Sequence, residues 1–180
     1  MEPFANLRDG GVQLASELLS APLLADVYAL TLAPIMPNGV PVALGLLAQL
    51  RSENGLQVRI EPIEATRTDD GLTITGVPQS QDAVIVVVDD GVETGTAALA
   101  AGRALRNRQG SQLGERQLVL VLAVPVCPHQ AVPDLTRVFD AVVAVHRPIG
   151  RRSLSWHFVD FDVIDEYQAR ELINDHEVHK

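Results

Sequence analysis

The chain has 180 residues, of which 47% are hydrophobic and 21% are charged, and its formal net charge is −9. This length suits a single domain, and the composition excludes a largely disordered chain. The longest apolar runs, residues 83–88 and 118–127, are far shorter than the ~20 residues that a membrane helix needs, and the excess of acidic residues argues against a broad nucleic-acid-binding surface.

Two features of the sequence bear on the cellular compartment. The first residues lack the basic segment and apolar core of a secretory signal, and the single cysteine, Cys127, cannot form an internal disulfide. We therefore expect a cytoplasmic protein that has no membrane or nucleic-acid partner. Any anion that it binds must be held by local groups, such as backbone amides, a helix N-terminus, a metal ion or a few arginines.

The first half of the chain alternates helical and strand-like patterns. Leucines at helical spacing indicate amphipathic helices, apolar runs indicate buried strands, and an Asp-Gly pair between β-branched runs is typical of a hairpin. The elements predicted in this half are a helix over residues 6–19, a strand over 26–34 with a loop to 39, a helix over 40–51, a strand over 56–62 and a hairpin within 64–77.

The second half is clearer because its strands are uniformly apolar, which is typical of strands buried on both faces. The elements predicted here are a strand over residues 83–88, a helix over 94–108, a strand over 117–124, a short helix or turn over 131–138 and a strand over 140–146. Residues 155–172 are expected to be less regular, and the polar tail 171–180 is expected to fray. Strands that alternate with helices predict an α/β fold with a doubly wound, mostly parallel sheet, in which ligands bind at the carboxyl ends of the strands.

One segment, residues 86–97 (VVVDDGVETGTA), carries the chemistry. Two carboxylates, Asp89 and Asp90, follow a buried strand, and a short loop with two glycines leads into a helix. The amides of such a loop and the helix N-terminus form an anion cradle, to which Thr94 and Thr96 add hydroxyl groups. Because carboxylates repel phosphate, they need another partner, and the two hydroxyls of a ribose suit them. The segment therefore predicts a site for a ribose 5-phosphate.

The same tripeptide provides an internal comparison at Asp69-Asp70-Gly71. There it lies between polar β-branched runs, so it is interpreted as a turn. The strand–loop–helix context at Asp89 is different and favours a binding function. The sequence contains no Gly-x-Gly-x-x-Gly after a strand, no Walker A loop, no zinc-ligand spacing and no Gly-x-Ser-x-Gly elbow.

The segment 86–97 closely resembles the 5-phosphoribosyl-1-pyrophosphate (PRPP) binding signature of the type I phosphoribosyltransferases. Residues 39–43, 121–128 and 156–161 also resemble the predicted bacterial branch of that family. The resemblance implies one phosphoribosyltransferase-like domain over residues 1–180, with a small hood from the terminal segments 1–25 and 150–180. It also implies a homodimer, as is common in the family.

The resemblance implies a role for each residue of the motif. Asp89 and Asp90 would hold the ribose hydroxyls, the loop would wrap the 5-phosphate with Thr94 and Gly95 at its centre, and Glu93 would act as a general base. The reaction would displace pyrophosphate from PRPP by a nitrogenous base, with Mg²⁺ neutralising the pyrophosphate. The residues implied to contact the ligand are Asn38, Gly39, Asp89, Asp90, Gly91, Val92, Glu93, Thr94, Gly95, Thr96 and Ala97.

The sequence departs from the family at the pyrophosphate loop. Family members usually carry Arg or Lys before Gly-Gly there, whereas residues 35–39 (IMPNG) have no basic side chain. An electrostatic donor to a departing anion is commonly worth ~3–4 kcal/mol, so this loss is expected to slow transfer by two to three orders of magnitude. The segment from the strand at 56–62 to the strand at 83–88, where the family often places a flexible catalytic loop, is short and hairpin-like and contains Arg59 and Arg67.

Three functions follow, in order of preference. The first is a phosphoribosyltransferase, and the second is a catalytically weak or inactive regulatory module that binds PRPP or a nucleoside 5-monophosphate. The third is a structural or interaction protein that has lost the site, against which the Asp89-Asp90 pair argues, since buried carboxylates without a partner are costly.

Other side chains have both a functional and a structural interpretation. Trp156 could stack on a nucleobase, His146 could line the site, and Arg147, Arg151 and Arg152 could supply the missing positive charge. For each of them we favour the structural interpretation: a core or interface tryptophan, a core or surface histidine and a solvated loop.

Overall fold

The computed structural model describes residues 2–51, 55–68, 71–112, 118–150 and 152–178. Its helices are α1 (Leu7–Leu19), α2 (Gly39–Leu50), α3 (Thr96–Gln112), α4 (Val132–Leu135) and α5 (Glu166–Val178), with 3-10 helices at Pro22–Leu24, His129–Ala131 and Leu154–His157. Its strands are β1 (Ala29–Pro34), β2 (Gln57–Ile60), β3 (Glu64–Thr68), β4 (Gly71–Gly76), β5 (Val84–Val88), β6 (Val119–Val126) and β7 (Ala141–His146).

The sheet has five parallel strands in the order β2–β1–β5–β6–β7. Leu32 of β1 pairs with Val86 of β5, and Val86 pairs with Val121 of β6. The chain moves outward from β1 to β2 and then crosses to β5 on the other side, so the order reverses between β1 and β5. This reversal creates the crevice in which α/β sheets bind ligands. The predicted α/β class and parallel sheet are confirmed.

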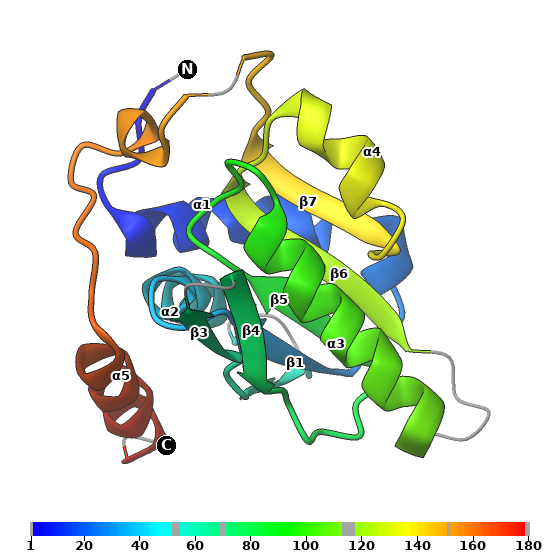
Figure 1. The fold of residues 1–180 in the computed structure, drawn as a ribbon. Helices are drawn as coiled ribbons and strands as arrows, with labels where there is room; N and C mark the ends of the chain where they lie inside the picture. Colours follow the sequence, from blue (N-terminus) through cyan, green and yellow to red (C-terminus); the bar gives the residue numbers. More distant parts are fainter. Residues whose placement is uncertain (1, 52–54, 69–70, 113–117, 151, 179–180) are drawn as a thin grey trace.

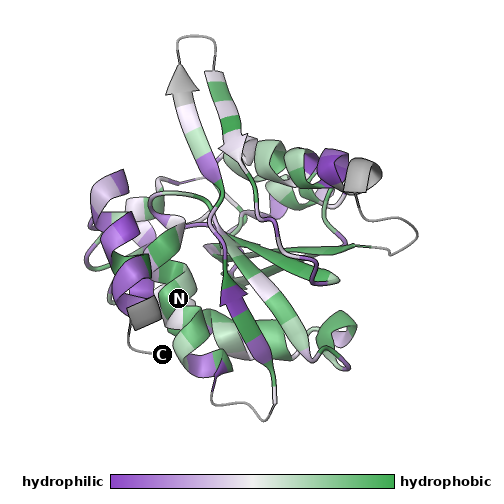
Figure 2. Ribbon diagram, turned by 90° about the horizontal axis from the view of Figure 1, so that it is seen from below, coloured by the Kyte–Doolittle hydropathy of each residue, from purple (hydrophilic) through white to green (hydrophobic). Residues whose placement is uncertain are grey.

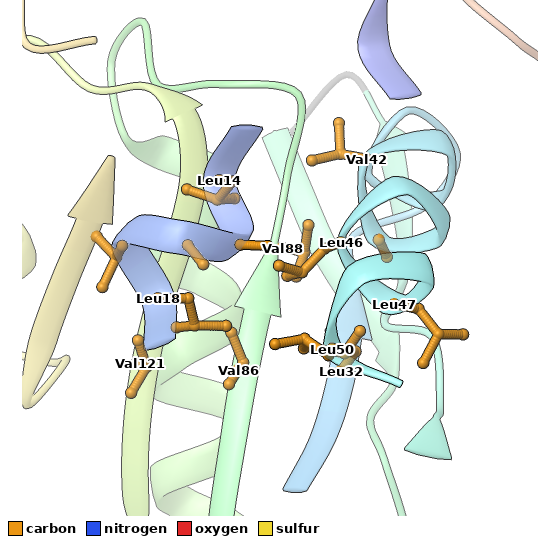
Figure 3. Close-up of a cluster of buried hydrophobic side chains, with 14 of the residues drawn as sticks. Leu14, Leu18, Leu32, Val42, Leu46, Leu47, Leu50, Val86, Val88 and Val121 are labelled. Carbon is orange, nitrogen blue, oxygen red and sulfur yellow. The ribbon is translucent and has the colours of Figure 1, made fainter. Parts of the chain in front are cut away.

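Helices cover both faces of the sheet (Figure 1). Helices α1 and α2 lie on one face and α3 and α4 on the other, which gives three layers. The core strands are green along most of their length in Figure 2, as expected for strands buried on both faces. Figure 3 shows Leu14 and Leu18 of α1 and Leu46 of α2 packed beside Val86 and Val88 of β5.

Helix α1 packs closely against α2 because small residues face each other at the crossing. A Cβ on Gly11 would lie 2.0 Å from the carbonyl oxygen of Val42, and one on Gly45 would lie 2.0 Å from that of Arg8. The N-terminus of α1 is capped by Asn6, whose side chain accepts a hydrogen bond from the amide of Asp9. In the part of the chain that the structure describes, no helix is long and apolar enough to cross a bilayer.

The predicted hairpin is present as the antiparallel pair β3–β4. It stands outside the main sheet and projects from the molecule (Figure 2). Ala65, Ile74 and Val77 pack against the apolar cluster under α3. The turn residues Asp69 and Asp70 lie outside the described residues.

The C-terminal arm, which we define as residues 152–178, differs from the prediction. The expected irregularity of residues 155–172 is wrong from Glu166 onward, and the expected fraying of residues 171–180 is wrong as far as Val178, because α5 is a continuous helix between Glu166 and Val178. Ala169 is fully buried and packs with Val40 and Leu44 of α2, and this tertiary contact outweighs the polar character of the helix. Residues 179–180 lie outside the described residues. Upstream, Phe158 forms a parallel bridge with Phe4, so the N-terminal segment and the arm lie side by side (Figure 1).

Candidate functional site

Two loops meet at the point where the strand order reverses. One follows β1 and spans residues 35–38, and the other joins β5 to α3 and spans residues 89–95. The amide of Ile35 donates to the carbonyl oxygen of Val88 over 2.8 Å. A Cβ on Gly39 would lie 2.5 Å from that same oxygen, so only glycine fits here. Backbone contact therefore fixes the two loops relative to each other.

The β5–α3 loop needs glycine at two positions. Gly95 has φ +80°, a conformation that L side chains rarely adopt. A Cβ on Gly91 would lie 2.4 Å from Cδ2 of Leu154, so the arm crosses directly over this residue. Between them, the amide of Val92 donates to the carbonyl oxygen of Val126 over 2.8 Å and ties the loop to β6.

The loop ends at an open helix N-terminus. The amide of Leu99 donates to the carbonyl oxygen of Gly95 over 2.9 Å, so the amides of residues 96–98 precede the first intrahelical bond. Of these, the amide of Thr96 donates to Oγ1 of Thr94 over 3.4 Å. The hydroxyl oxygens of Thr94 and Thr96 are 3.0 Å apart beside these amides, and both side chains are exposed. This arrangement of amides and hydroxyls is suited to an anion, which the helix dipole also favours.

A cleft of about 490 Å³ opens over this loop. One wall comes from the loop and α3, a second from the hairpin and a third from the arm. Its lining residues are Gly71, Leu72, Asp89, Asp90, Gly91, Val92, Glu93, Thr94, Gly95, Thr96, Ala97, Ala98, Leu154 and Phe161.

The carboxylates at the end of β5 are held in place. Oδ1 of Asp89 accepts from the amide of Asp90 over 2.9 Å, and Oδ2 of Asp90 accepts from Nδ2 of Asn38 over 3.2 Å. Burial raises the pKa of Asp90 above its ordinary value, the nearby Glu93 carboxylate raises it further, and the hydrogen bond from Asn38 opposes the shift. The carboxylate that would hold a diol is thus partly desolvated before any ligand arrives.

Glu93 lines the cleft and is exposed. Its Oε1 accepts a hydrogen bond from the amide of Leu154 over 3.0 Å. In this structure the side chain therefore joins the loop to the arm. One carboxylate oxygen is used in this way, and the predicted role of Glu93 as a general base stays a prediction.

The predicted motif residues Asp89 to Ala97 all line the cleft. Asn38 and Gly39 do not line it but support it from behind, the former through Asp90 and the latter through Val88. Sequence reasoning missed five other residues that line it: Gly71, Leu72, Ala98, Leu154 and Phe161. The available signals were the position of Leu72 directly after the predicted hairpin turn and the aromatic side chain of Phe161 in the arm. Nothing in the local sequence indicates that these two segments fold over the loop.

The weaker candidates lie elsewhere. His146 is buried and stacks on Phe4, with ring centroids 4.3 Å apart, as a core residue. The guanidinium of Arg147 donates to the carbonyl oxygen of Val142, and Arg152 lies over the exposed ring of Trp156. A core position for Trp156 is wrong, since its side chain is 72% exposed, whereas an interface position stays a prediction. Arg151 and the side chain of Arg67 lie outside the described residues.

The charge of the cleft is negative. Asp89, Asp90 and Glu93 line it, and none of the described lining residues is a lysine or arginine. Arg59 forms a salt bridge with Asp82, at 2.6 Å. Within the described ranges, no group of three or more His, Cys, Asp or Glu side chains is placed to hold a metal ion.

Comparison with known proteins identifies the fold. A scan against models of protein families finds no match. Among solved structures, TT1426 from Thermus thermophilus is 19% identical, with a TM-score of 0.72 over 97% of this chain and 99% of that one. The xanthine-guanine-hypoxanthine phosphoribosyltransferase of Helicobacter pylori is 16% identical, with a TM-score of 0.51 over 93% and 92%.

A third structure, the hypoxanthine phosphoribosyltransferase of Trypanosoma cruzi in complex with the product IMP, is 17% identical. Its TM-score is 0.53 over 80% of this chain and 77% of that one. At these identities the similarity concerns the fold and not the activity. The chain therefore has the fold of the type I phosphoribosyltransferases.

Proposed function

We propose that the protein binds a 5-phosphoribosyl ligand in the cleft over the β5–α3 loop and transfers the phosphoribosyl group from PRPP to a nitrogenous base. The observation that carries the proposal is the pairing of two carboxylates with an open helix N-terminus across one short loop. Asp89 and Asp90 are suited to the two ribose hydroxyls, and the amides of residues 97 and 98 with the Thr94 and Thr96 hydroxyls are suited to the 5-phosphate.

The transfer is a substitution at the anomeric carbon. The lone pair of the base nitrogen forms the new bond to this carbon, the bond from the carbon to the pyrophosphate oxygen breaks, and pyrophosphate leaves with the electron pair. The proton on the attacking nitrogen passes to a carboxylate, for which Glu93 is the proposed acceptor. Catalysis rests on positioning of the two reactants and on stabilisation of the departing charge.

The substrate is proposed to be the Mg²⁺ complex of PRPP. The described lining residues offer three carboxylates and no cation, so the charge of the pyrophosphate must be balanced by a metal ion that enters with it. Pyrophosphate oxygens are the hard ligands that Mg²⁺ prefers. Without Mg²⁺, we expect PRPP to bind much more weakly than with it.

Calorimetric titration of PRPP with Mg²⁺ tests the proposal. The wild type is compared with Asp89→Asn/Asp90→Asn and with a matched control, Asp26→Asn/Asp134→Asn, which removes the same charge at two exposed positions outside the lining of the cleft. We expect binding by the wild type and the control and its loss in the first double variant. Absence of binding by the wild type at millimolar PRPP would overturn the proposal.

A screen for pyrophosphate release across purine and pyrimidine bases then tests the transfer itself. Release that depends on one base supports a transferase and identifies its acceptor. Binding without release for any base would refute transfer and assign the protein to the second function, a regulatory module that binds PRPP or a nucleotide.

A further inference from the structure

Asn38 occupies the N-cap position of α2 but does not cap the helix. Asparagine is among the preferred capping residues, and its side chain would ordinarily accept from an amide of the first turn. Here both ends of the side-chain amide are used elsewhere. Nδ2 donates to Oδ2 of Asp90 over 3.2 Å, and Oδ1 accepts from the amide of Ile164 over 3.2 Å.

The arm is attached to the site at two points. The amide of Leu154 donates to Glu93, and the amide of Ile164 donates to Asn38, which in turn holds Asp90. Between these points, Phe161 lines the cleft. Beyond them, Ile164 packs in the apolar cluster that seats α5 on α2, and Arg170 of α5 forms a salt bridge with Glu64 of the hairpin.

We propose that Asn38 is a positioning residue that orients Asp90 for the ribose hydroxyls and couples this carboxylate to the C-terminal arm. The inference rests on the proposed function for its ligand. The pair of hydrogen bonds that joins Asn38 to Asp90 and to Ile164, which we call the bridge, is independent of any ligand. This role differs from the direct ligand contact that the resemblance implied for Asn38, because Asn38 acts through Asp90.

The bridge has two physical consequences. A donor amide on Oδ2 fixes the orientation of the Asp90 carboxylate and stabilises its ionised form, which burial disfavours. The carboxylate of Glu93 raises the pKa of Asp90, as burial does, whereas hydrogen bonds with Asn38, Asp89 and the Gly91 backbone lower it. Asn38 therefore opposes both burial and the repulsion from Glu93. Because coupling is reciprocal, a ligand that orders Asp90 also strengthens the attachment of the arm at Ile164.

Two substitutions separate the two halves of the bridge. Asn38→Ala removes both hydrogen bonds. Asn38→Asp keeps an oxygen that accepts from Ile164 but places a like charge beside Asp90 in place of the donor. The matched control is Asn6→Ala, which removes a true helix cap in α1 without contact to the cleft.

Three measurements are made on each variant of the full chain. They are hydrogen exchange at the Ile164 amide, the carboxyl NMR titration of Asp90, and calorimetric binding of PRPP with Mg²⁺. For Asn38→Ala we expect loss of protection at Ile164, an upward shift of the Asp90 titration midpoint and about 10- to 100-fold weaker binding, as for a hydrogen bond to a charged group. For Asn38→Asp we expect protection to persist and binding to be lost.

The outcomes distinguish the inference from a general effect on stability and from the proposed function. A purely structural role for Asn38 would lower stability, as Asn6→Ala does, and leave the Asp90 titration in place. An unchanged titration or unchanged protection at Ile164 in Asn38→Ala refutes the inference. If the wild type does not bind PRPP, the proposed function fails, while exchange and titration still decide whether Asn38 bridges Asp90 and the arm.

Discussion

Replacement of Gly39 by alanine is expected to separate the two loops that form the site. The added Cβ would lie 2.5 Å from the carbonyl oxygen of Val88, whereas real Cβ contacts are essentially never below 3.0 Å. The neighbour is backbone, so no side-chain rotation relieves the contact and the strand ends must move apart by at least 0.5 Å. That oxygen also accepts the hydrogen bond from the amide of Ile35, which the movement weakens.

The energetic cost follows from these two effects. Overpacking in a close-packed interior costs about 1–3 kcal/mol, and loss of a buried backbone hydrogen bond adds about 0.5–1.5 kcal/mol. The expected loss of unfolding free energy is thus about 1.5–4.5 kcal/mol. For a chain of this size that corresponds to a fall in Tm of about 3–18 °C. A typical domain with about 5–15 kcal/mol of stability would remain folded.

Urea denaturation followed by circular dichroism measures this loss. The only tryptophan, Trp156, is largely exposed and would report poorly on unfolding by fluorescence. Gly150→Ala is the matched control, because a Cβ there meets no atom within 4 Å. A cost below about 0.5 kcal/mol for Gly39→Ala, the range of ordinary surface changes, would refute the steric argument.

Three further predictions concern single residues. Burial raises the pKa of Asp90, so the folded state binds this proton more tightly than the unfolded state and stability falls as the pH rises above ~3.8. Asp90→Asn should therefore raise Tm at pH 7, and an unchanged or lower Tm contradicts this. Burial lowers the pKa of His146, so the unfolded state takes up the proton first and stability falls as the pH drops below ~6.5. His146→Leu should make the urea midpoint depend less on pH between about pH 7.5 and 5.5. An equally steep dependence in the variant would show that His146 is not its source. Gly95→Ala should cost about 1–2 kcal/mol in urea denaturation through its positive φ alone, since the nearest atom is 3.6 Å away; a neutral result would show that the loop relaxes.

Most of the secondary structure could be predicted because its signals are local. The uniformly apolar run predicted β5 within one residue, and the Asp-Gly pair predicted the β3–β4 hairpin. Helix α5 was not predicted, since its sequence is polar and its few apolar residues gain stability only against α2. The exposure of Trp156 could not be predicted either, because the burial of a side chain depends on which other segments fold over it.

The parts of the site that are contiguous in the chain could be predicted from the sequence. Asp89, Asp90 and the loop to Ala97 lie within nine positions, so strand, loop and helix geometry places them together. The residues around them come from distant parts of the chain, and only folding brings these parts together. Asn38 reaches Asp90 across 52 positions, and Leu154 reaches Glu93 across 61. Such pairings depend on the order of strands and on the path of the arm, which no local pattern of residues encodes.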